Sequence, residues 1–295
     1  MTVATLNRTT PTPPDLTITP RDLRFGREER TARWWLNGDP YETAIYNALS
    51  ATFPLGEANF IETVRAFRDH ADERLAGEIK AFTTQEVIHS REHVAFNKRA
   101  TDAGFDLRPL EQAVEDSLVE LRAKPPIVGL MSTMCLEHFT AIIAHELLAT
   151  PRHLAGADQA TSDMWRWHAV EEIEHKGVAY DTWLAVTAKM PRFKRWKLKS
   201  MMMLLVTKNF VKHRTEGALE LLRQDGLTGR KVWWTLQWKM WGSPGVFRKV
   251  AGGWFKFFLP GFHPWNEDDR ALIKGWEQTY PYLQVPPKKR VRGAL

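Results

Sequence analysis

The stretch that decides the fold is HAVEEIEH, residues 168–175. Residues three, four and seven positions apart share one face of a helix, so His168, Glu172 and His175 would present imidazole, carboxylate and imidazole in a row. A related Glu-x-x-His element, EVIH, occupies residues 86–89. Two such pairs, with one Glu from each of two further helices, form the ligand set of carboxylate-bridged two-metal bundles. The sequence therefore predicts a helical bundle around a dinuclear metal site.

Helical patterns also account for the chain on both sides of this stretch. Pro54 suits a first turn, Gly104 suits a helix end, and Asp158 suits an N-cap. The predicted helices cover residues 41–52, 54–70, 72–103, 108–124, 127–150 and 159–188, and no clear β-pattern interrupts them. We expect an all-α, ferritin-like four-helix bundle with additional helices and a basic, aromatic-rich C-terminal extension.

Charge divides the chain into two unlike parts. Residues 189–295 contain 22 Lys+Arg against 7 Asp+Glu, whereas residues 1–188 contain 19 against 28. Eight of the 13 Trp lie in the basic part. We therefore expect a flexible N-terminal arm (1–30), a ferritin-like metal-binding bundle (31–190) and a basic aromatic extension packed on the bundle (191–295). The arm could instead lie on the surface.

The basic extension has three interpretations. Its aromatic side chains can pack on the bundle while Lys and Arg reach outward, and such a cover could also form the wall of a substrate tunnel. Basic faces with Trp and Phe also suit peripheral contact with a membrane. Nucleic acid is not expected as a partner, because no recognised module is present.

The composition of the chain indicates the cellular compartment to expect. The only cysteine, Cys135, excludes an internal disulfide and suits a reducing cytosol. We find neither a secretory signal nor a run of about 18 apolar residues, so no transmembrane helix is expected. The predicted location is cytoplasmic, with membrane-peripheral as the alternative.

The spacing of acidic residues extends the candidate metal site. Glu57 precedes Glu86 by 29 residues, and Glu137 precedes Glu172 by 35. Each gap suits one helix, a turn and half of the next helix, so antiparallel neighbours would bring the carboxylates level. The candidate ligands are Glu57, Glu86, His89, Glu137, His168, Glu172 and His175.

The sequence leaves alternative roles open for several Glu and His residues. Glu62 competes with Glu57, and His168 either binds metal or packs beside it. Glu92 could orient His89 from behind, and His93 is either a rival ligand or a supporting group. His138 points away from Glu137 by about 100° and is not expected to bind metal. Two further groups have alternative roles: His263 is a packed turn residue or lines a pocket, and Glu171 and Glu174 are solvated or hold Arg or Lys.

The donor types indicate which metals the site prefers. Four Glu carboxylates balance the charge of two divalent cations, which avoids a large desolvation cost for a buried pair. The mixture of oxygen and imidazole donors favours two iron ions, with manganese as the alternative, over zinc.

The order Glu, Glu-x-x-His, Glu, His-x-x-x-Glu-x-x-His resembles that of the ferritin-like di-iron oxygenases, and the third His resembles the arylamine N-oxygenases. This resemblance covers about residues 54–180. Over most of residues 30–285, the chain is similar to a bacterial family labelled "predicted metal-dependent hydrolase". The motifs that carry this second resemblance are FPLGE at 53–57, QEVIHSREH at 85–93, EHFT at 137–140, EEIEH at 171–175 and PGFHPW at 260–265.

Three functions follow from these resemblances. The first expectation is a di-iron oxidoreductase, a monooxygenase or oxidase that activates O₂ to oxidise a small hydrophobic molecule or an amine. Because no nucleotide- or flavin-binding signature occurs, its electrons would come from an external donor. The first alternative is a hydrolase that takes its hydroxide from a dinuclear metal site. The second is a non-catalytic metal-binding or membrane-peripheral protein.

Overall fold

The computed structural model describes residues 12–27, 30–242 and 245–284, and all regular structure in these ranges is helical. This confirms the all-α class. The α-helices are α1 (Pro40–Ser50), α2 (Phe53–Arg65), α3 (Glu73–Asp102), α4 (Arg108–Arg122), α5 (Pro126–Ala149), α6 (Gln159–His175), α7 (Val178–Val186), α8 (Arg192–Arg223), α9 (Arg230–Trp241), α10 (Val246–Lys256) and α11 (Arg270–Thr279). Short 3₁₀ turns occur at Arg68–His70, Pro151–Leu154, Pro264–Asn266 and Pro281–Leu283.

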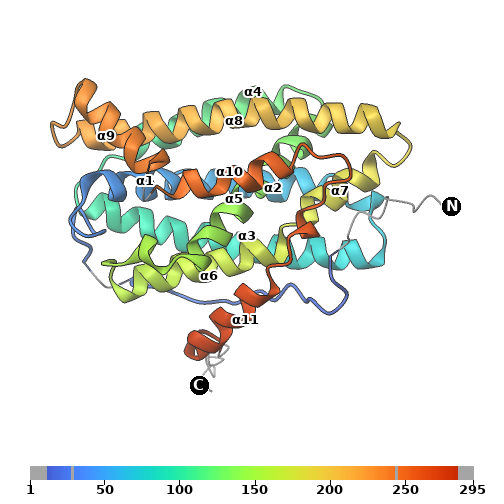
Figure 1. Cartoon of the computed structure of the whole chain (residues 1–295), viewed down its shortest axis with the longest axis horizontal. Helices are drawn as coiled ribbons and strands as arrows, with labels where there is room; N and C mark the ends of the chain where they lie inside the picture. Colours follow the sequence, from blue (N-terminus) through green and yellow to red (C-terminus); the bar gives the residue numbers. More distant parts are fainter. Residues whose placement is uncertain (1–11, 28–29, 243–244, 285–295) are drawn as a thin grey trace, which may run out of the picture.

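Four helices, α2, α3, α5 and α6, surround a common interior. Helix α2 packs on α3 and α5, and α6 packs on the same two helices, so the four close into a ring. Their axes follow the long dimension of the molecule (Figure 1). Side chains that point inward from all four helices therefore meet in one place.

The remaining helices cover this ring. Helix α8 packs on α1, α4 and α5, α10 packs on α5, and α11 packs on α6. Figure 1 shows α8 and α4 on one side of the ring and α11 on the other. Each of the two hydrophobic clusters contains residues from before and after position 190. Trp167 and Leu222 lie in one cluster, and Phe82 and Phe257 lie in the other.

Local signals set most helix ends as the sequence predicts. The Asp158 carboxylate accepts the N–H of Thr161 and caps α6. Gly104, just past α3, adopts a φ of +96°, which a side chain would strain. Helix α5 begins with Pro126 in its first turn.

The predicted helix over residues 159–188 is wrong in one respect, because the structure divides it into α6 and α7. The break lies at Lys176 and Gly177, directly after His175. A Cβ on Gly177 would lie 3.0 Å from Thr12 Oγ1 and 3.0 Å from Trp265 Cδ1. Segments near both ends of the chain therefore approach the backbone closely here, a contact that helical periodicity does not reveal.

Helix α5 is long and apolar enough to cross a membrane by length and composition, with a mean hydropathy of 1.6 over its best window. However, 61% of that window is buried inside the protein, and the helix carries the buried carboxylate of Glu137. We therefore interpret α5 as the core helix of the ring.

The described part of the expected N-terminal arm, residues 12–27, lies across α3 and α6. The N–H of Thr19 donates to Glu174 on α6, and the N–H of Phe25 donates to Glu92 on α3. Phe25 is buried against Trp167. Residues 1–11 and 28–29 of that arm lie outside the described residues.

Candidate metal centre

The four helices of the ring bring every candidate ligand into its interior. Helix α2 contributes Glu57, α3 contributes Glu86 and His89, α5 contributes Glu137, and α6 contributes His168, Glu172 and His175. Each of these residues is buried, with at most 4% of its surface exposed. The rival Glu62 is exposed and faces Arg122 instead.

The ligand atoms form four overlapping groups of three, one of which joins His93 to Glu57 and His168. Within each group of three, one donor atom per side chain lies within 4.8 Å of the others. One group joins Glu86, Glu137 and His175, and another joins Glu57, Glu86 and His89. A third joins His89, His168 and Glu172. Glu86 belongs to the group that contains His89 and to the group that contains His175. Glu172 lies 3.5 Å from His89 Nδ1 and also 3.5 Å from His175 Nε2. Each of these two carboxylates could therefore serve two ions.

Most of these donor atoms lack a hydrogen-bond partner although they are buried. The atoms concerned are Glu57 Oε1, both carboxylate oxygens of Glu86 and of Glu137, Glu172 Oε2, His89 Nδ1 and His175 Nε2. Buried polar atoms are nearly always satisfied in proteins, so such a cluster needs an explanation. A cation bound between these atoms would satisfy all of them.

Outer partners determine which nitrogen of His175 carries the proton. Gln85 Nε2 donates to the Glu174 carboxylate at 2.8 Å, so the amide oxygen of Gln85 faces His175. That oxygen accepts from His175 Nδ1 at 2.9 Å. The bare Nε2 of His175 therefore points at Glu86 and Glu137, at 3.1 and 3.4 Å. A lone pair facing carboxylate oxygens is unfavourable unless a cation lies between them.

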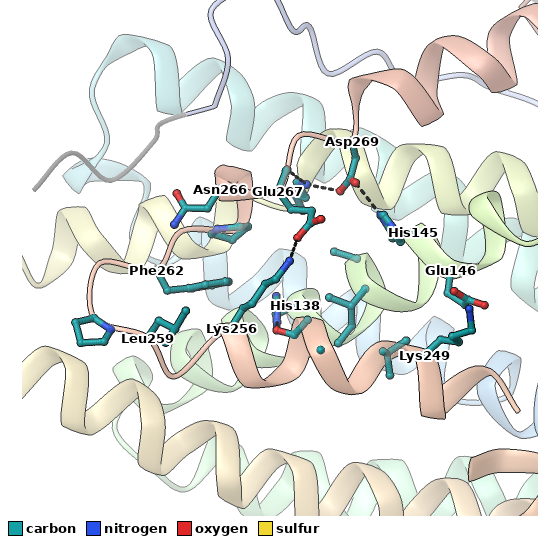
Figure 2. A pocket seen from close by; sticks show the side chains of 18 residues that line it. His138, His145, Glu146, Lys249, Lys256, Leu259, Phe262, Asn266, Glu267 and Asp269 are labelled. Atoms are coloured by element: carbon teal, nitrogen blue, oxygen red, sulfur yellow. Dashed lines mark hydrogen bonds and ion pairs between the residues drawn. The ribbon is translucent and has the colours of Figure 1, made fainter. Parts of the chain in front are cut away.

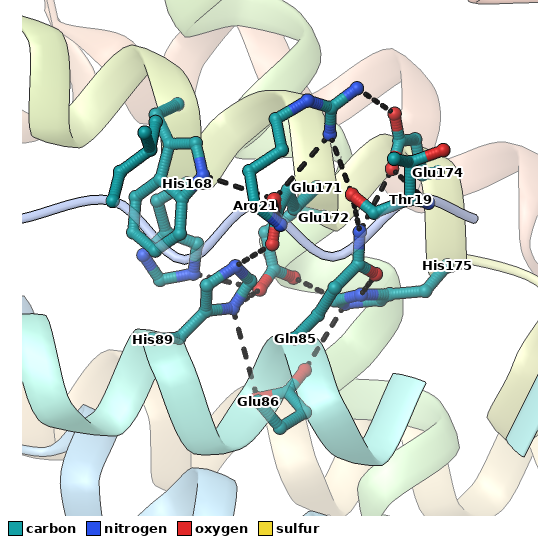
Figure 3. A network of polar contacts seen from close by, with 12 residues as sticks. Thr19, Arg21, Gln85, Glu86, His89, His168, Glu171, Glu172, Glu174 and His175 are labelled. Carbon is teal, nitrogen blue, oxygen red and sulfur yellow. Dashed lines mark hydrogen bonds and ion pairs between the residues drawn. The ribbon is translucent and has the colours of Figure 1, made fainter. Parts of the chain in front are cut away.

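His89 has the same arrangement with Glu171 as its outer partner. Its Nε2 lies 3.1 Å from the Glu171 carboxylate, which also accepts from Trp167 Nε1 and from the backbone N–H of Arg21. His89 Nδ1 then turns its lone pair toward Glu172 and Glu86 (Figure 3). Ligand histidines in metal proteins are held in this way.

A relay of side chains orients His168. Asn97 Nδ2 donates to the carbonyl of Ser50, so Asn97 Oδ1 accepts the Ser50 hydroxyl at 2.6 Å. Ser50 Oγ must then accept from His93 Nδ1 at 2.8 Å, and His93 Nε2 accepts from His168 Nδ1 at 2.6 Å. Burial lowers the pKa of both imidazoles, so both rings are neutral. His168 Nε2 is thus bare and lies 2.7 Å from the Glu172 carboxylate.

The carboxylates show the electrostatic cost of this convergence. Burial raises the pKa of Glu57, Glu86 and Glu137 well above the ordinary value, and neighbouring carboxylates raise it further. Burial acts on Glu172 in the same direction, and the pKa of Glu172 falls well below its ordinary value when positive charge on His175 and His168 offsets that effect. A bound cation would supply such charge when both rings are neutral. Without a cation, the site must hold extra protons.

The sequence reasoning missed the main outer partners of the site. Glu92 does not orient His89, because its carboxylate accepts from the N–H of Phe25 and pairs with Arg27 and Arg91. Glu171 has that role. The charge pattern of residues 171–175 allowed for an Arg partner, and Arg21 supplies it.

Arg21 fastens the N-terminal segment over the outside of the site. It pairs with Glu174 at 2.7 Å and with Glu171 at 3.4 Å (Figure 3). Its guanidinium also lies over the Trp276 ring. The carboxylates that orient His89 and bind Gln85 are thus held by a residue about 150 positions away in the chain.

Two other histidines have structural roles. His138 Nε2 lies 3.1 Å from the carbonyl of Gly253, outside the metal cluster, as expected. His263 is fully buried, accepts the N–H of Trp265 and contacts Asp181, which identifies it as a packed turn residue.

Three cavities lined by described residues lie around the ring. The largest, about 490 Å³, lies between α5, α10 and the loop before α11 and contains none of the candidate ligands. Figure 2 shows two of the pairs among its charged groups, Lys256 with Glu267 and His145 with Asp269. A small cavity of about 40 Å³ reaches His168 and Glu172, and a third cavity of about 210 Å³ adjoins it.

The fold and this site together define an all-α protein with a buried carboxylate and histidine cluster suited to a metal ion. A family model described as "predicted metal-dependent hydrolase" matches residues 19–268, and the chain belongs to this family. No curated protein and no solved structure matches the chain.

Family membership corrects the main functional expectation. The di-iron oxygenase reading, with its oxidoreductase class, is wrong, because the family is described as hydrolytic. Carboxylate and imidazole ligands around two cations can serve either chemistry, so the ligand pattern could not separate the two. The family supports the alternative, a metal-dependent hydrolase.

Proposed function

We propose that the protein hydrolyses its substrate at two divalent cations, iron or manganese, held between α2, α3, α5 and α6. The observation that carries this proposal is the convergence of buried donor atoms without hydrogen-bond partners from all four helices. The ligand order resembles that of ferritin-like di-iron proteins, which favours two cations over one.

Each ligand has a proposed place. Glu57, His89 and His168 would bind one cation, and Glu137 and His175 would bind the other. Glu86 and Glu172, which lie between the two groups of donors, would help to hold both cations. Bound divalent cations supply a Lewis acid for a substrate carbonyl and lower the pKa of water to the neutral range.

The chain's own residues prepare this site. Gln85, Glu171 and His93 fix the three imidazoles so that each presents a bare nitrogen. The small cavity beside His168 and Glu172 has walls that include Phe53 and Trp165, which exclude bulk water around the reacting bond. Substrate would therefore arrive on the His168 side.

The decisive experiment combines metal analysis with anaerobic turnover. We expect about two metal ions per chain in the purified protein. Protein stripped by chelation and reloaded with Mn²⁺ or Fe²⁺ should hydrolyse chromogenic esters or amides with apolar acyl groups in the absence of O₂. Glu57→Gln should lose at least tenfold in metal affinity, because changing even the hydrogen-bond partner of a ligand costs about 10- to 100-fold.

Glu62→Gln is the matched control, because Glu62 lies on the same helix but is exposed. It should leave metal content and turnover unchanged. Turnover that survives both chelation and Glu57→Gln would contradict the proposal, as would activity that requires O₂.

A further inference from the structure

The cavity of about 210 Å³ lies between α2, α4, α5 and α8, next to the small cavity that touches the metal ligands. Leu49, Phe53, Thr140 and Phe210 line both cavities. The two spaces therefore adjoin at these four side chains, and the smaller space reaches His168 and Glu172.

Arg214 lines this cavity and has no carboxylate partner. It is 7% exposed, and within the described residues no acidic side chain lies within 4.0 Å of its guanidinium. Two other buried cations have carboxylate partners, Lys176 in Asp269 and Arg99 in Asp158. The buried Lys199 has backbone carbonyls as its acceptors, among them that of Phe257. Burial lowers the pKa of Arg214 to about 10, so its side chain is charged at neutral pH.

The hydrogen bonds of Arg214 leave part of its guanidinium free. Nη1 donates to the carbonyl of Ala48 and to Thr52 Oγ1, at 2.8 and 2.7 Å, which helps to cap the end of α1. Nη2 makes no hydrogen bond within the described residues, whereas Nε, also without a partner, is enclosed by protein atoms and out of a ligand's reach. A buried cationic donor beside an otherwise largely apolar space is the arrangement that recognises a carboxylate on an apolar molecule.

We infer that this cavity binds the apolar, anionic part of the substrate, with a carboxylate on Arg214 and the scissile bond beyond Phe53 and Phe210 at the metal centre. The substrate class is an ester or amide whose apolar body carries a carboxylate group. The reaction assigned to it rests on the proposed function, but the binding site does not.

Gly56 offers a way to test the cavity without disturbing the fold. It lies on α2 and lines the cavity, and a Cβ there would have no other atom within 4 Å. Gly56→Leu should fill the space and abolish ligand binding. Gly77→Leu is the matched control, because Gly77 is exposed on α3 and a Cβ there also meets nothing.

The probes are octanoate and octan-1-ol, titrated calorimetrically into the metal-loaded protein at neutral pH. We expect octanoate to bind roughly tenfold more tightly, the size of a charge-assisted hydrogen bond in a buried site. Arg214→Gln keeps a capping donor but removes the charge, so it should abolish this preference and spare octan-1-ol. Arg223→Gln is the control on the same helix, where Arg223 is exposed and pairs with Glu220.

Three outcomes would overturn the inference. The first is equal affinity of the wild type for octanoate and octan-1-ol. The second is an unchanged preference for octanoate in Arg214→Gln. The third is loss of binding of both probes in Arg214→Gln, which would indicate a purely structural role. Octanoate could also bind the metals directly, so the titration is repeated after chelation, and binding that vanishes there contradicts the assignment. Metal-dependent turnover is measured separately, so a failure of this site leaves the proposed function standing.

Discussion

At the scale of single residues, three imidazoles share one arrangement. Each turns one nitrogen outward to a hydrogen-bond partner and one bare nitrogen inward to carboxylates. For His89 and His175 the outer partners are Glu171 and Gln85, and for His168 the partner is the relay that ends at Asn97. The ligand set is therefore held ready by the folded chain, and this preorganisation is what a metal site requires.

Ser50→Ala tests the relay. Without the hydroxyl, His93 loses the acceptor that fixes its tautomer, and His168 loses its defined orientation. We expect a roughly tenfold to hundredfold loss of metal affinity, measured by competition with a chelator. Thr84→Ala, which removes a hydroxyl that bonds only within α3, is the control. Equal affinities in the two variants would contradict the relay.

Metal removal should make stability depend on pH. Folding raises the pKa of Glu57, Glu86 and Glu137 above the value of about 4.3 that a Glu has in the unfolded chain. At a pH above about 4.3, these three carboxyl groups therefore bind more protons in the folded state than in the unfolded state. Linkage then requires the metal-free protein to lose stability as pH rises through this range. Bound cations replace those protons.

We therefore expect the difference in Tm between metal-loaded and chelated protein to widen from about pH 5 to pH 8. Differential scanning calorimetry measures it. Glu137→Gln should narrow the difference, because one carboxylate no longer repels the others. A difference that is the same at both pH values would count against a carboxylate-rich metal site.

At the scale of elements, close helix crossings set the positions of the ligands. Gly217 on α8 lies at one such crossing, because a Cβ there would lie 3.1 Å from Leu110 Cδ2 and 3.3 Å from Ala48 Cβ. Helix α8 can approach α1 and α4 only with a small residue at this point. The same approach places Arg214 against the end of α1.

Gly217→Val should destabilise the protein by about 1–3 kcal/mol through overpacking. Gly77→Ala, at an exposed helical glycine with open space around it, should stabilise the protein by about 1 kcal/mol. Urea denaturation followed by circular dichroism measures both. If Gly217→Val were as stable as the wild type, the crossing would be looser than the structure indicates.

At the scale of the whole molecule, the basic part of the chain presents an apolar outer face. On α8, Met201, Leu204 and Leu205 are more than half exposed, and Lys197 and Lys208 lie among them. Trp234 and Trp238 on α9 are also more than 60% exposed. Helices α8 and α9 lie at the same side of the molecule (Figure 1). We propose that this face contacts an anionic lipid surface.

Vesicle flotation tests this proposal. Binding to vesicles that contain phosphatidylglycerol should weaken as salt rises, and vesicles of phosphatidylcholine alone should bind less. Lys197→Gln and Lys208→Gln should each lower the affinity about fivefold. Val119→Ser, which changes an exposed apolar residue on α4, is the control. If the protein does not bind these vesicles at low salt, the proposal is wrong.

The sequence by itself determined the helices and the candidate ligands, because both depend on local spacing. Periodicity, caps and breakers act within a few residues, and Glu-x-x-His places two donors on one helical face whatever surrounds it. That is why Glu86, Glu172 and their histidines could be named before the fold was known. The break at Gly177 was missed because its cause lies in distant segments.

Only the tertiary structure decided the partners of those ligands. Glu171 rather than Glu92 orients His89, Arg21 holds Glu171 from about 150 residues away, and Arg214 faces a cavity assembled by four helices. Contacts of this kind depend on how helices pack, and helix packing admits several angles and registers for the same periodic pattern. The ligand pattern also could not predict the type of reaction, because the same donors around two cations can serve hydrolysis or oxidation.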